Sequence, residues 1–271
     1  MTMKTVEIRS AENAHLKAWR RLAESARACR LAGRTLAEGL HLAQAALAAG
    51  APVQAVILRE GAAQPAIELA RAAAERHALP LHLLTGALYE RLAPVPEGAG
   101  LMLELAIARP PRPQALAQDA VYLSGVQEPG NVGALLRTAA AAGIAQVAAS
   151  PDTAYLWSPK VLRAGMGAHF VLALHEGVGA EELPAMFRAE RLAAEASGGE
   201  DLYSADWGQG PTLWMFGSEG AGLAPAAQAL CQRGLTIPVD AAVESLNVAA
   251  AAAVCLFEQR RRRLNLRSGR A

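Results

Sequence analysis

The stretch QEPGNVGALLRTAAAAG, Gln127–Gly143, follows the apolar run AVYLSGV and predicts a buried strand, a glycine-containing loop and a helix, in that order. Nearly every side chain of the helix is small or apolar, and Arg137 is its one charge. Burying a lone guanidinium is costly unless a carboxylate, a phosphate or another ligand faces it. We therefore expect Arg137 to face such a partner, and Asn131 is a candidate N-cap of the helix.

Outward from this stretch, strands and helices alternate to the end of the chain, with a last helix over about residues 246–263. Such alternation predicts an α/β fold with a parallel sheet, and ligands of such sheets bind at the carboxyl ends of the strands. The predicted strands of this part are AVYLSGV, AQVAAS, FVLAL, RLAAEAS, TLWMFGS and LTIPV.

The N-terminal part predicts a second, smaller α/β domain. NAHLKAWRRLAESARACRLAG predicts one long amphipathic helix, and VQAVILRE and GLMLELAIA predict buried strands. Three prolines in ARPPRPQALAQD would stop both a helix and a central strand. We therefore predict a domain over residues 1–107, a linker over 108–119 and a second domain over 120–271.

Composition excludes several classes of protein. The 271 residues are 52% hydrophobic and carry a formal net charge of +1, so the chain is neither disordered by composition nor held to nucleic acid by bulk charge. Three distant cysteines and six scattered histidines show no metal-ligand spacing. The start, MTMKTVEIRSAEN, has no apolar segment typical of a secretion signal. We expect a cytoplasmic protein without a metal and without a membrane anchor.

Two later segments carry polar residues where strands end. LWMFGSEGAGL runs from a strand into three glycines around Glu219, a carboxylate that could pair with Arg137 if it is buried. IPVDAAVESLNV places Ser245 and Asn247 at a helix start, where N-capping by Ser245 is the simplest interpretation. Two arginine-rich runs, in the first helix and at Arg260–Arg263, are most often solvated faces, and contact with an RNA backbone is the alternative.

Taken together, EPGNVGALLRTAAAAG, SPKVLRAGMGAHF, FGSEGAGL and IPVDAAVESLNVAAAAAV resemble the three motifs of the SpoU/TrmH family of RNA ribose 2'-O-methyltransferases, within the SPOUT class. The resemblance implies a catalytic domain with a deep trefoil knot, S-adenosylmethionine as cofactor, and a homodimer formed through the knot helices. IRSAENAHLKAWRRLAE resembles the family's small RNA-recruiting domain, which has a ribosomal-protein-like fold.

The resemblance also assigns residues. Arg137 matches the catalytic arginine, as a base or as a group that grips phosphate and stabilises developing negative charge. Asn131, Glu219, Ser245 and Asn247 match the other polar motif positions. The cofactor would contact Gly217, Ile237 and Leu246, with Gly220 and Gly222 leaving it room. The residues expected to contact RNA are Lys17, Arg20, Arg27 and Arg163.

The implied reaction is methyl transfer to a ribose 2'-hydroxyl of structured RNA, with 23S ribosomal RNA expected rather than tRNA by analogy alone. Four positions depart from the family's common pattern: Glu128 stands in place of Asp, Gly165 in place of Ser, Ala241 in place of Gly and Ala249 in place of a second Ser. Two alternatives remain open: another nucleotide-using α/β enzyme, such as a dehydrogenase or a kinase, and a non-catalytic RNA-binding factor. The absence of GxGxxG and of GK[ST] argues against the first, and the intact polar motifs argue against the second.

Overall fold

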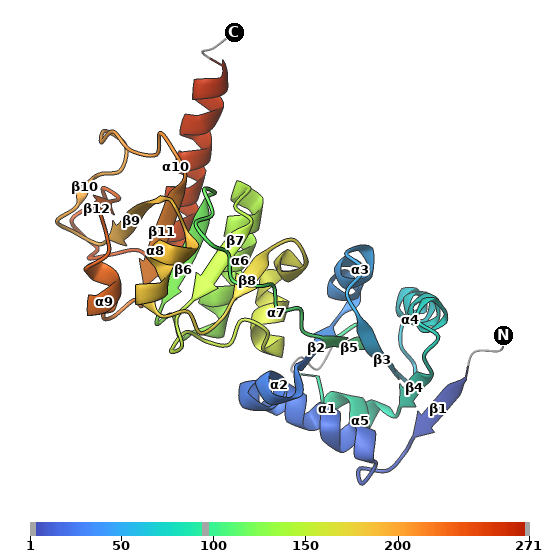
Figure 1. Cartoon of the computed structure of the whole chain (residues 1–271). Coiled ribbons are helices and arrows are strands. Elements are labelled where there is room, and N and C mark those ends of the chain that lie inside the picture. Colours follow the sequence, from blue (N-terminus) through green and yellow to red (C-terminus); the bar gives the residue numbers. More distant parts are fainter. Residues whose placement is uncertain (1–3, 94–97, 269–271) are drawn as a thin grey trace. The chain divides into compact units, whose positions relative to one another are not determined.

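The computed structural model describes residues 4–93 and 98–268. It divides into two compact units (Figure 1). Unit 1 holds the residues up to Ala108 together with Trp157–Phe170, and unit 2 holds Arg109–Leu156 together with the residues from Val171 onward.

Unit 1 is built on a five-stranded mixed sheet of order β1-β4-β3-β5-β2, in which β5 is antiparallel to both of its neighbours. Figure 1 shows α3 and α4 on one face of this sheet and α1, α2 and α5 on the other. Its elements are β1 (Thr5–Ile8), α1 (Ala14–Glu24), α2 (Ala26–Ala32), β2 (Arg34–Glu38), α3 (Leu40–Ala48), β3 (Val53–Arg59), α4 (Gln64–Arg76), β4 (Leu81–Leu84), α5 (Gly86–Glu90), β5 (Leu101–Ala106), α7 (Pro159–Gly165) and the 3-10 turn η1 (Ala168–Phe170).

The long N-terminal helix expected from the sequence is two helices that meet at Ser25. This residue has extended backbone angles, and its Oγ accepts a hydrogen bond from Ala28 N at 3.2 Å. Serine competes for backbone groups in this way and therefore favours helix ends over helix interiors. The expectation of one helix was wrong because the amphipathic pattern continues across this cap.

Unit 2 is built on a seven-stranded sheet of order β10-β12-β9-β11-β6-β7-β8, and every strand pair is parallel, as predicted. Its elements are β6 (Ala120–Ser124), α6 (Pro129–Ala142), β7 (Gln146–Ala149), β8 (Ala173–His175), η2 (Ala180–Glu182), α8 (Leu183–Met186), β9 (Glu190–Glu195), β10 (Glu200–Asp201), β11 (Thr212–Gly217), α9 (Pro225–Gln228), β12 (Arg233–Thr236) and α10 (Val248–Ser268).

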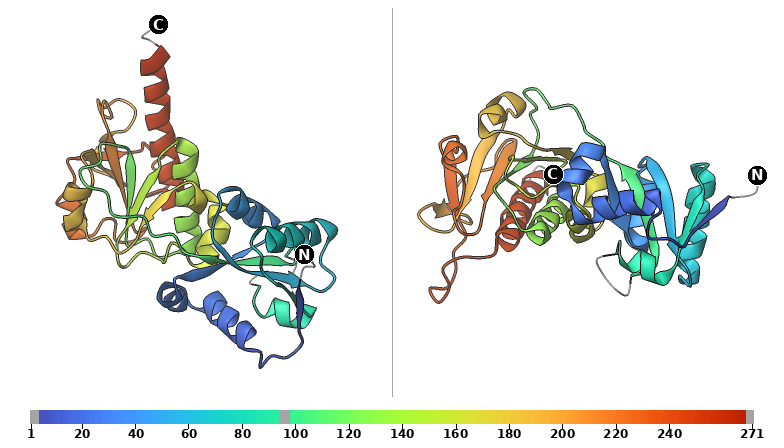
Figure 2. Two further views of the ribbon diagram at one scale, coloured as in Figure 1. Left: turned by 45° about the vertical axis from the view of Figure 1, so that its right-hand side comes forward. Right: turned by 90° about the horizontal axis from the view of Figure 1, so that it is seen from below.

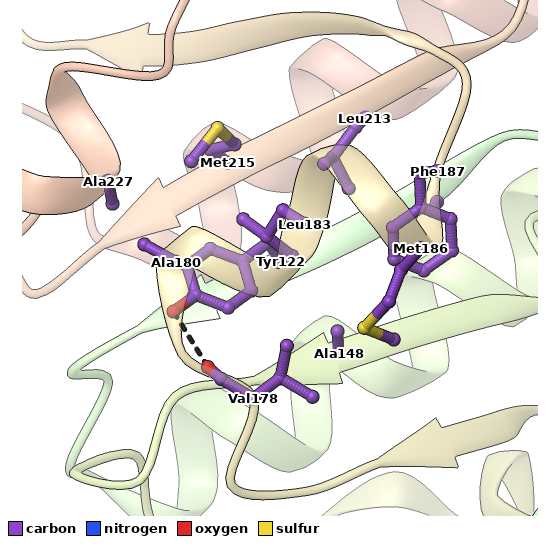
Figure 3. Packing of buried hydrophobic residues seen from close by; sticks show 11 residues of the cluster. Tyr122, Ala148, Val178, Ala180, Leu183, Met186, Phe187, Leu213, Met215 and Ala227 are labelled. Atoms are coloured by element: carbon purple, nitrogen blue, oxygen red, sulfur yellow. Dashed lines mark hydrogen bonds between the residues drawn. The ribbon is translucent and has the colours of Figure 1, made fainter. Parts of the chain in front are cut away.

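Both faces of the unit 2 sheet are buried, which explains the nearly continuous apolar strands. On β11, Leu213 and Met215 point into a cluster with Tyr122 and with Leu183 and Phe187 of the α8 region (Figure 3). Tyr122 keeps its hydroxyl satisfied by donating to Val178 O at 3.1 Å. The intervening residues, Trp214 and Phe216, face the opposite side, where the Trp214 indole donates to Gln259 of α10.

The segment 157–170 joins unit 1, which differs from the predicted domain over 120–271. Thr35 Oγ1 of β2 donates to Trp157 O at 2.6 Å, and α7 packs against β2. The strand expected at FVLAL is correspondingly shorter: Phe170 lies in the 3-10 turn η1, and β8 begins at Ala173. In the described part of the chain, no helix has both the length and the apolar character needed to cross a membrane.

Candidate functional site

The carboxyl ends of β9, β11 and β12 surround a cavity of about 220 Å³. The predicted cofactor residues all line it, together with two of the predicted catalytic residues. These are Gly217, Gly220, Gly222, Ile237 and Leu246, with Glu219 and Ser245. Parallel α/β sheets bind ligands at this edge because loops from several strands converge there. Three segments far apart in the sequence therefore form one site.

A polar network joins the first motif to the later ones at the wall of this cavity. Asn131 Nδ2 donates to Glu219 Oε1 at 3.1 Å, and Asn247 Nδ2 donates to Asn131 Oδ1 at 3.1 Å and also to the same Glu219 oxygen. The backbone N of Val248 approaches that oxygen at 3.4 Å. Glu219 thus fixes the loop after β11 relative to α6 and to the start of α10.

Helix capping in the site differs from the prediction at both helices. The N-cap of α6 is Glu128, whose Oε1 accepts from Gly130 N at 3.2 Å, which leaves Asn131 free for the network. The N-cap of α10 is Asn247, whose Oδ1 accepts from Ala249 N at 3.0 Å. Ser245 is exposed and lines the cavity instead. The helix begins later than the sequence suggested, so the cap moves from serine to asparagine.

The glycine-rich loop after β11 closes on itself. Ser218 and Gly222 exchange two backbone hydrogen bonds of 3.0 and 2.9 Å, and Gly222 has a φ of +66°. A Cβ on Gly217 would lie 2.1 Å from the carbonyl carbon of Gly222. Gly217 is therefore required by the turn itself, whereas Cβ atoms on Gly220 and Gly222 would meet nothing within 4 Å. The expectation that a side chain on these glycines would crowd a cofactor stays a prediction, and the turn gives Gly217 a second, local reason.

A second cavity of about 560 Å³ lies on the other side of the same loop. It shares Glu219 with the first cavity and is also lined by Asn131, Glu128 and Asp152. Gly125 N holds the β6–α6 loop in place by donating to the hydroxyls that follow β7, at 2.9 Å to Ser150 Oγ and at 3.1 Å to Thr153 Oγ1. The Asn131–Glu219 pair thus separates two openings at one edge of the sheet.

Arg137 is exposed, and among the described residues it makes no ion pair or hydrogen bond. The expected pair with a buried Glu219 is not formed, because Glu219 binds the two asparagines. Arg137 follows Asn131 by six residues, which places it about 9 Å along the helix and about 120° around it. It therefore lies away from the cavity of its own chain and carries no desolvation cost in the isolated chain.

The predicted RNA contacts lie in unit 1 and differ in their surroundings. Lys17 pairs with Glu12, and Arg20 pairs with Glu24 at 2.7 Å, both on the exposed side of α1. Arg27 is exposed and has no partner among the described residues. Arg21, which belongs to the same arginine-rich run, is also exposed and without a partner among the described residues.

Arg163 on α7 lies 3.9 Å from Glu38, whose side chain is 10% exposed. Burial raises the pKa of Glu38, and the nearby guanidinium of Arg163 opposes this shift. Arg163 is therefore engaged in part by Glu38, a carboxylate of the same unit. A group of residues able to hold a metal ion is not found among the described residues.

Two carboxylates at the site were missed by sequence reasoning. Glu195 ends β9 and lines the first cavity, and Asp152 lines the second. Glu195 lies near the carboxyl end of the predicted strand RLAAEAS, and Asp152 comes two residues after the predicted strand AQVAAS. Their place near the carboxyl edge of the sheet was a signal that could have found them.

The comparisons with known proteins agree with this geometry. Residues 119–257 match the SpoU rRNA Methylase family. The chain is 31% identical to an uncharacterized tRNA/rRNA methyltransferase of Synechocystis, with 96% of each chain covered. It is 34% identical to the 23S rRNA (guanosine-2'-O-)-methyltransferase of Pseudomonas syringae, over 53% of this chain and 58% of that one.

Its fold resembles that of the rRNA methyltransferase of Sinorhizobium meliloti solved with S-adenosylmethionine bound, with a TM-score of 0.83, 23% identity and coverage of 95% and 98% of the two chains. The family match takes in the strands of unit 2 and all the loops that surround the two cavities. The chain therefore belongs to the SpoU rRNA methylase family.

Proposed function

We propose that this chain transfers the methyl group of S-adenosylmethionine to a ribose 2'-hydroxyl of ribosomal RNA. The observation that carries the proposal is the Asn131–Glu219–Asn247 network, because it brings the polar residues of separate motifs together at the wall of the cavity. Without it, each motif would be a glycine turn or a helix cap with no common purpose.

The cavity fits the proposed cofactor. Ile237, Leu246 and Phe216 offer apolar surface to a purine, and Glu195 and Glu219 offer negative charge to a cation, whereas no lysine, arginine or histidine is among the described lining residues. S-adenosylmethionine supplies an electrophilic methyl group on a positively charged sulfur. The backbone groups of the loop after β11 lie along the same wall and would orient the bound molecule.

In this proposal the side chains of the network align the acceptor ribose. Asn131 and Asn247 are held by Glu219, so their orientation is fixed before RNA binds, which lowers the entropic cost of alignment. The second cavity, which shares Glu219, is the entrance for the target nucleotide. Ser245 lies at the rim of the first cavity, within the same loop region.

Arg137 is proposed to bind a phosphate of the RNA and to stabilise the negative charge that develops on the attacking 2'-oxygen. A guanidinium stays protonated near neutrality, so it is suited to this electrostatic role and poorly suited to accept the proton. The proton of the 2'-hydroxyl then leaves to solvent. Because Arg137 lies away from the cavity of its own chain, the proposal places it at the cavity of a second copy.

An apolar stripe supports the proposed homodimer. α6 and α10 lie side by side in unit 2 (Figure 2). Phe257 and Leu264 of α10 are 46% and 49% exposed, and Ala250 continues their row at helical spacing. On α6, Arg137 shares a row with Gly130, Ala134 and Ala141, of which Ala134 is half-buried and the others are exposed. If these helices paired between two copies of the chain, the apolar row of Ala250, Phe257 and Leu264 would be buried. Arg137 would then lie next to the partner subunit.

We also propose the family's deep trefoil knot for unit 2 and a role in RNA recruitment for unit 1. The last strand, β12, lies between β9 and β10 rather than at the sheet edge, which supports a late return of the chain into the sheet. The exposed basic residues of α1 and α2 support RNA binding by unit 1. Similarity to the Pseudomonas syringae enzyme favours 23S ribosomal RNA.

The test of the activity is transfer of a labelled methyl group from S-adenosylmethionine to purified 23S rRNA, followed by mapping of new 2'-O-methyl sites. Transfer to 23S rRNA at one position is expected. Transfer to tRNA alone would overturn the substrate, and transfer to neither RNA would overturn the activity. Binding of rRNA without any transfer would instead support a non-catalytic RNA-binding factor.

The shared site is tested by mixing two inactive variants, Arg137→Ala and Glu219→Ala. If Arg137 acts across the dimer, half of the randomly mixed dimers regain one intact site, so about a quarter of the wild-type activity returns. If Arg137 acts within its own chain, every site in the mixture stays defective. Recovery of activity on mixing therefore separates the two arrangements, provided that subunits exchange.

A further inference from the structure

Glu195 is a carboxylate at the wall of the proposed cofactor cavity that the family motifs do not include. It is the last residue of β9, and its register partner on β12 is Thr236. The cavity lies at this carboxyl edge, where Glu195 is half-buried among the lining residues. A strand, and not a mobile loop tip, therefore positions this carboxylate.

Two neighbours hold the Glu195 side chain. Gln228 Nε2 of α9 donates to its Oε1 at 2.9 Å. On β12, Gly234 faces the carboxylate so closely that a Cβ there would lie 2.5 Å from Glu195 Cδ and 2.6 Å from each carboxylate oxygen. Glycine is the residue that leaves room for this side chain at that position. The carboxylate is thus oriented by groups of the protein itself, and among the described residues Oε2 has no hydrogen-bond donor.

The two carboxylates of the cavity have different surroundings. Glu219 accepts hydrogen bonds from two asparagines at the wall where β11 meets α6 and α10. Glu195 lies on β9, and β11 separates β9 from β6 in the sheet. Ala194 and Ala196, which flank Glu195 in the lining, have no side-chain donor. An ionised carboxylate only accepts hydrogen bonds, so this wall can bind a ligand that donates them.

We propose that Glu195 binds the ribose hydroxyls of S-adenosylmethionine. This inference rests on the proposed function. A ribose presents two neighbouring O–H donors, which match a carboxylate with a free oxygen. With the ribose held at the β9 wall, the sulfur end of the molecule is left for the wall formed by Glu219 and Asn247, where the acceptor enters. Glu195 is therefore a cofactor-binding residue, and Gln228 and Gly234 position it.

The test is calorimetric binding of three ligands to the wild type and to Glu195→Gln. S-adenosylmethionine, S-adenosylhomocysteine and 5'-methylthioadenosine all carry the ribose hydroxyls, whereas only the first has the positive sulfur and only the first two have the amino acid. Glu195→Gln should weaken all three by a similar factor of about 10. The 2'-deoxy form of 5'-methylthioadenosine lacks one of the two ribose hydroxyls. The difference between its affinities for the wild type and for Glu195→Gln should therefore be smaller.

Three outcomes would overturn the assignment. A loss confined to S-adenosylmethionine would indicate contact with the sulfur, a loss confined to the two amino-acid ligands would indicate contact with the ammonium group, and unchanged binding would remove Glu195 from the site. Glu190→Gln is the matched control, since it makes the same change at the other end of β9 and should bind as the wild type does.

Gln228→Ala keeps the carboxylate and should lose less affinity than Glu195→Gln. Circular dichroism and thermal unfolding establish that each variant is folded before its binding is compared. If the wild type binds none of the three ligands, the proposed function itself is contradicted. If the wild type and Glu195→Gln bind them equally well, only the role of Glu195 is contradicted.

Discussion

The arginines at the end of α10 and those of α1 and α2 look alike in the sequence, yet they have different environments. Arg262 lies over the Trp207 ring at 4.5 Å and donates to the carbonyl oxygens of Leu202, Tyr203 and Ala205 at 2.7–2.8 Å. Arg27 on α2 is exposed and has no partner among the described residues. The arginine run of α10 holds unit 2 together, whereas Arg27 on α2 leaves its charge free for a ligand.

The neighbours of Arg262 extend this role. Arg263 Nη2 donates to Asp119 Oδ1 at 2.7 Å, and Arg260 Nη1 donates to Ala142 O at 3.2 Å at the end of α6. These contacts tie the last helix to the first strand and the first helix of unit 2. A run of like charges in a sequence is therefore no guide to function until its partners are known.

The largest expected effect concerns Arg137, which is exposed like Arg27 but is proposed to act in catalysis. Arg137→Ala should lower methyl transfer by about 100-fold or more, since it removes a charge that stabilises the transition state. Its melting temperature should stay close to that of the wild type. Initial rates and thermal unfolding measure the two effects.

Arg188→Ala is the control for Arg137→Ala, because Arg188 is another exposed arginine of unit 2. It lies just before β9, at the amino ends of the strands, whereas the cavities lie at their carboxyl ends. It should retain full transfer. An Arg137→Ala variant with wild-type rates would contradict the catalytic assignment.

The second effect is on stability. Arg262→Ala should lower the free energy of unfolding of unit 2 by about 2–4 kcal/mol, because it removes the carbonyl hydrogen bonds and the contact with the Trp207 ring. Arg261→Ala removes an arginine that is 59% exposed and pairs with Glu258, so its cost should stay below about 1 kcal/mol. Urea denaturation compares the two, and equal losses would show that the role of Arg262 has been misread.

The third effect is on RNA binding. Arg27→Glu should weaken binding to rRNA fragments by about 5- to 10-fold at moderate salt and reduce the salt dependence, because a phosphate contact is lost. Arg71→Glu makes the same change on α4, on the other face of the unit 1 sheet, and should bind nearly as the wild type does. Filter binding over a range of salt concentrations measures both, and equal losses would mean that only net charge matters.

The smallest effect is the pH dependence of the stability that Glu258 gives to α10 through Arg261 and Arg262. Hydrogen bonds from Arg261 lower the pKa of Glu258, with a further contribution from Arg262. A carboxylate whose pKa is lower in the folded state contributes stability above its unfolded pKa, and this contribution is lost as the pH falls through the folded value. Unfolding followed from pH 7 to pH 3 should therefore show a loss below about 4.5 that Glu258→Gln reduces. The same profile for both proteins would contradict this coupling.

The alternation of strands and helices, the parallel sheet of unit 2 and the loops that carry the candidate site residues could be predicted because they depend on local pattern. A buried parallel strand such as AVYLS is apolar on both faces, and glycines mark the loop that must turn sharply after β11. The family followed from the order of such motifs, since each motif alone was also consistent with a plain turn or cap.

The partners of the charged residues could not be predicted, because they are set by contacts between residues far apart in the chain. Glu219 meets Asn131 across 88 positions and leaves Arg137 without a partner. The sequence by itself determined which side chains this protein has for chemistry and on which elements they lie. Only the tertiary structure decided which charges are neutralised inside the fold and which are left for a ligand, because the free energy of a charge depends on the groups that surround it.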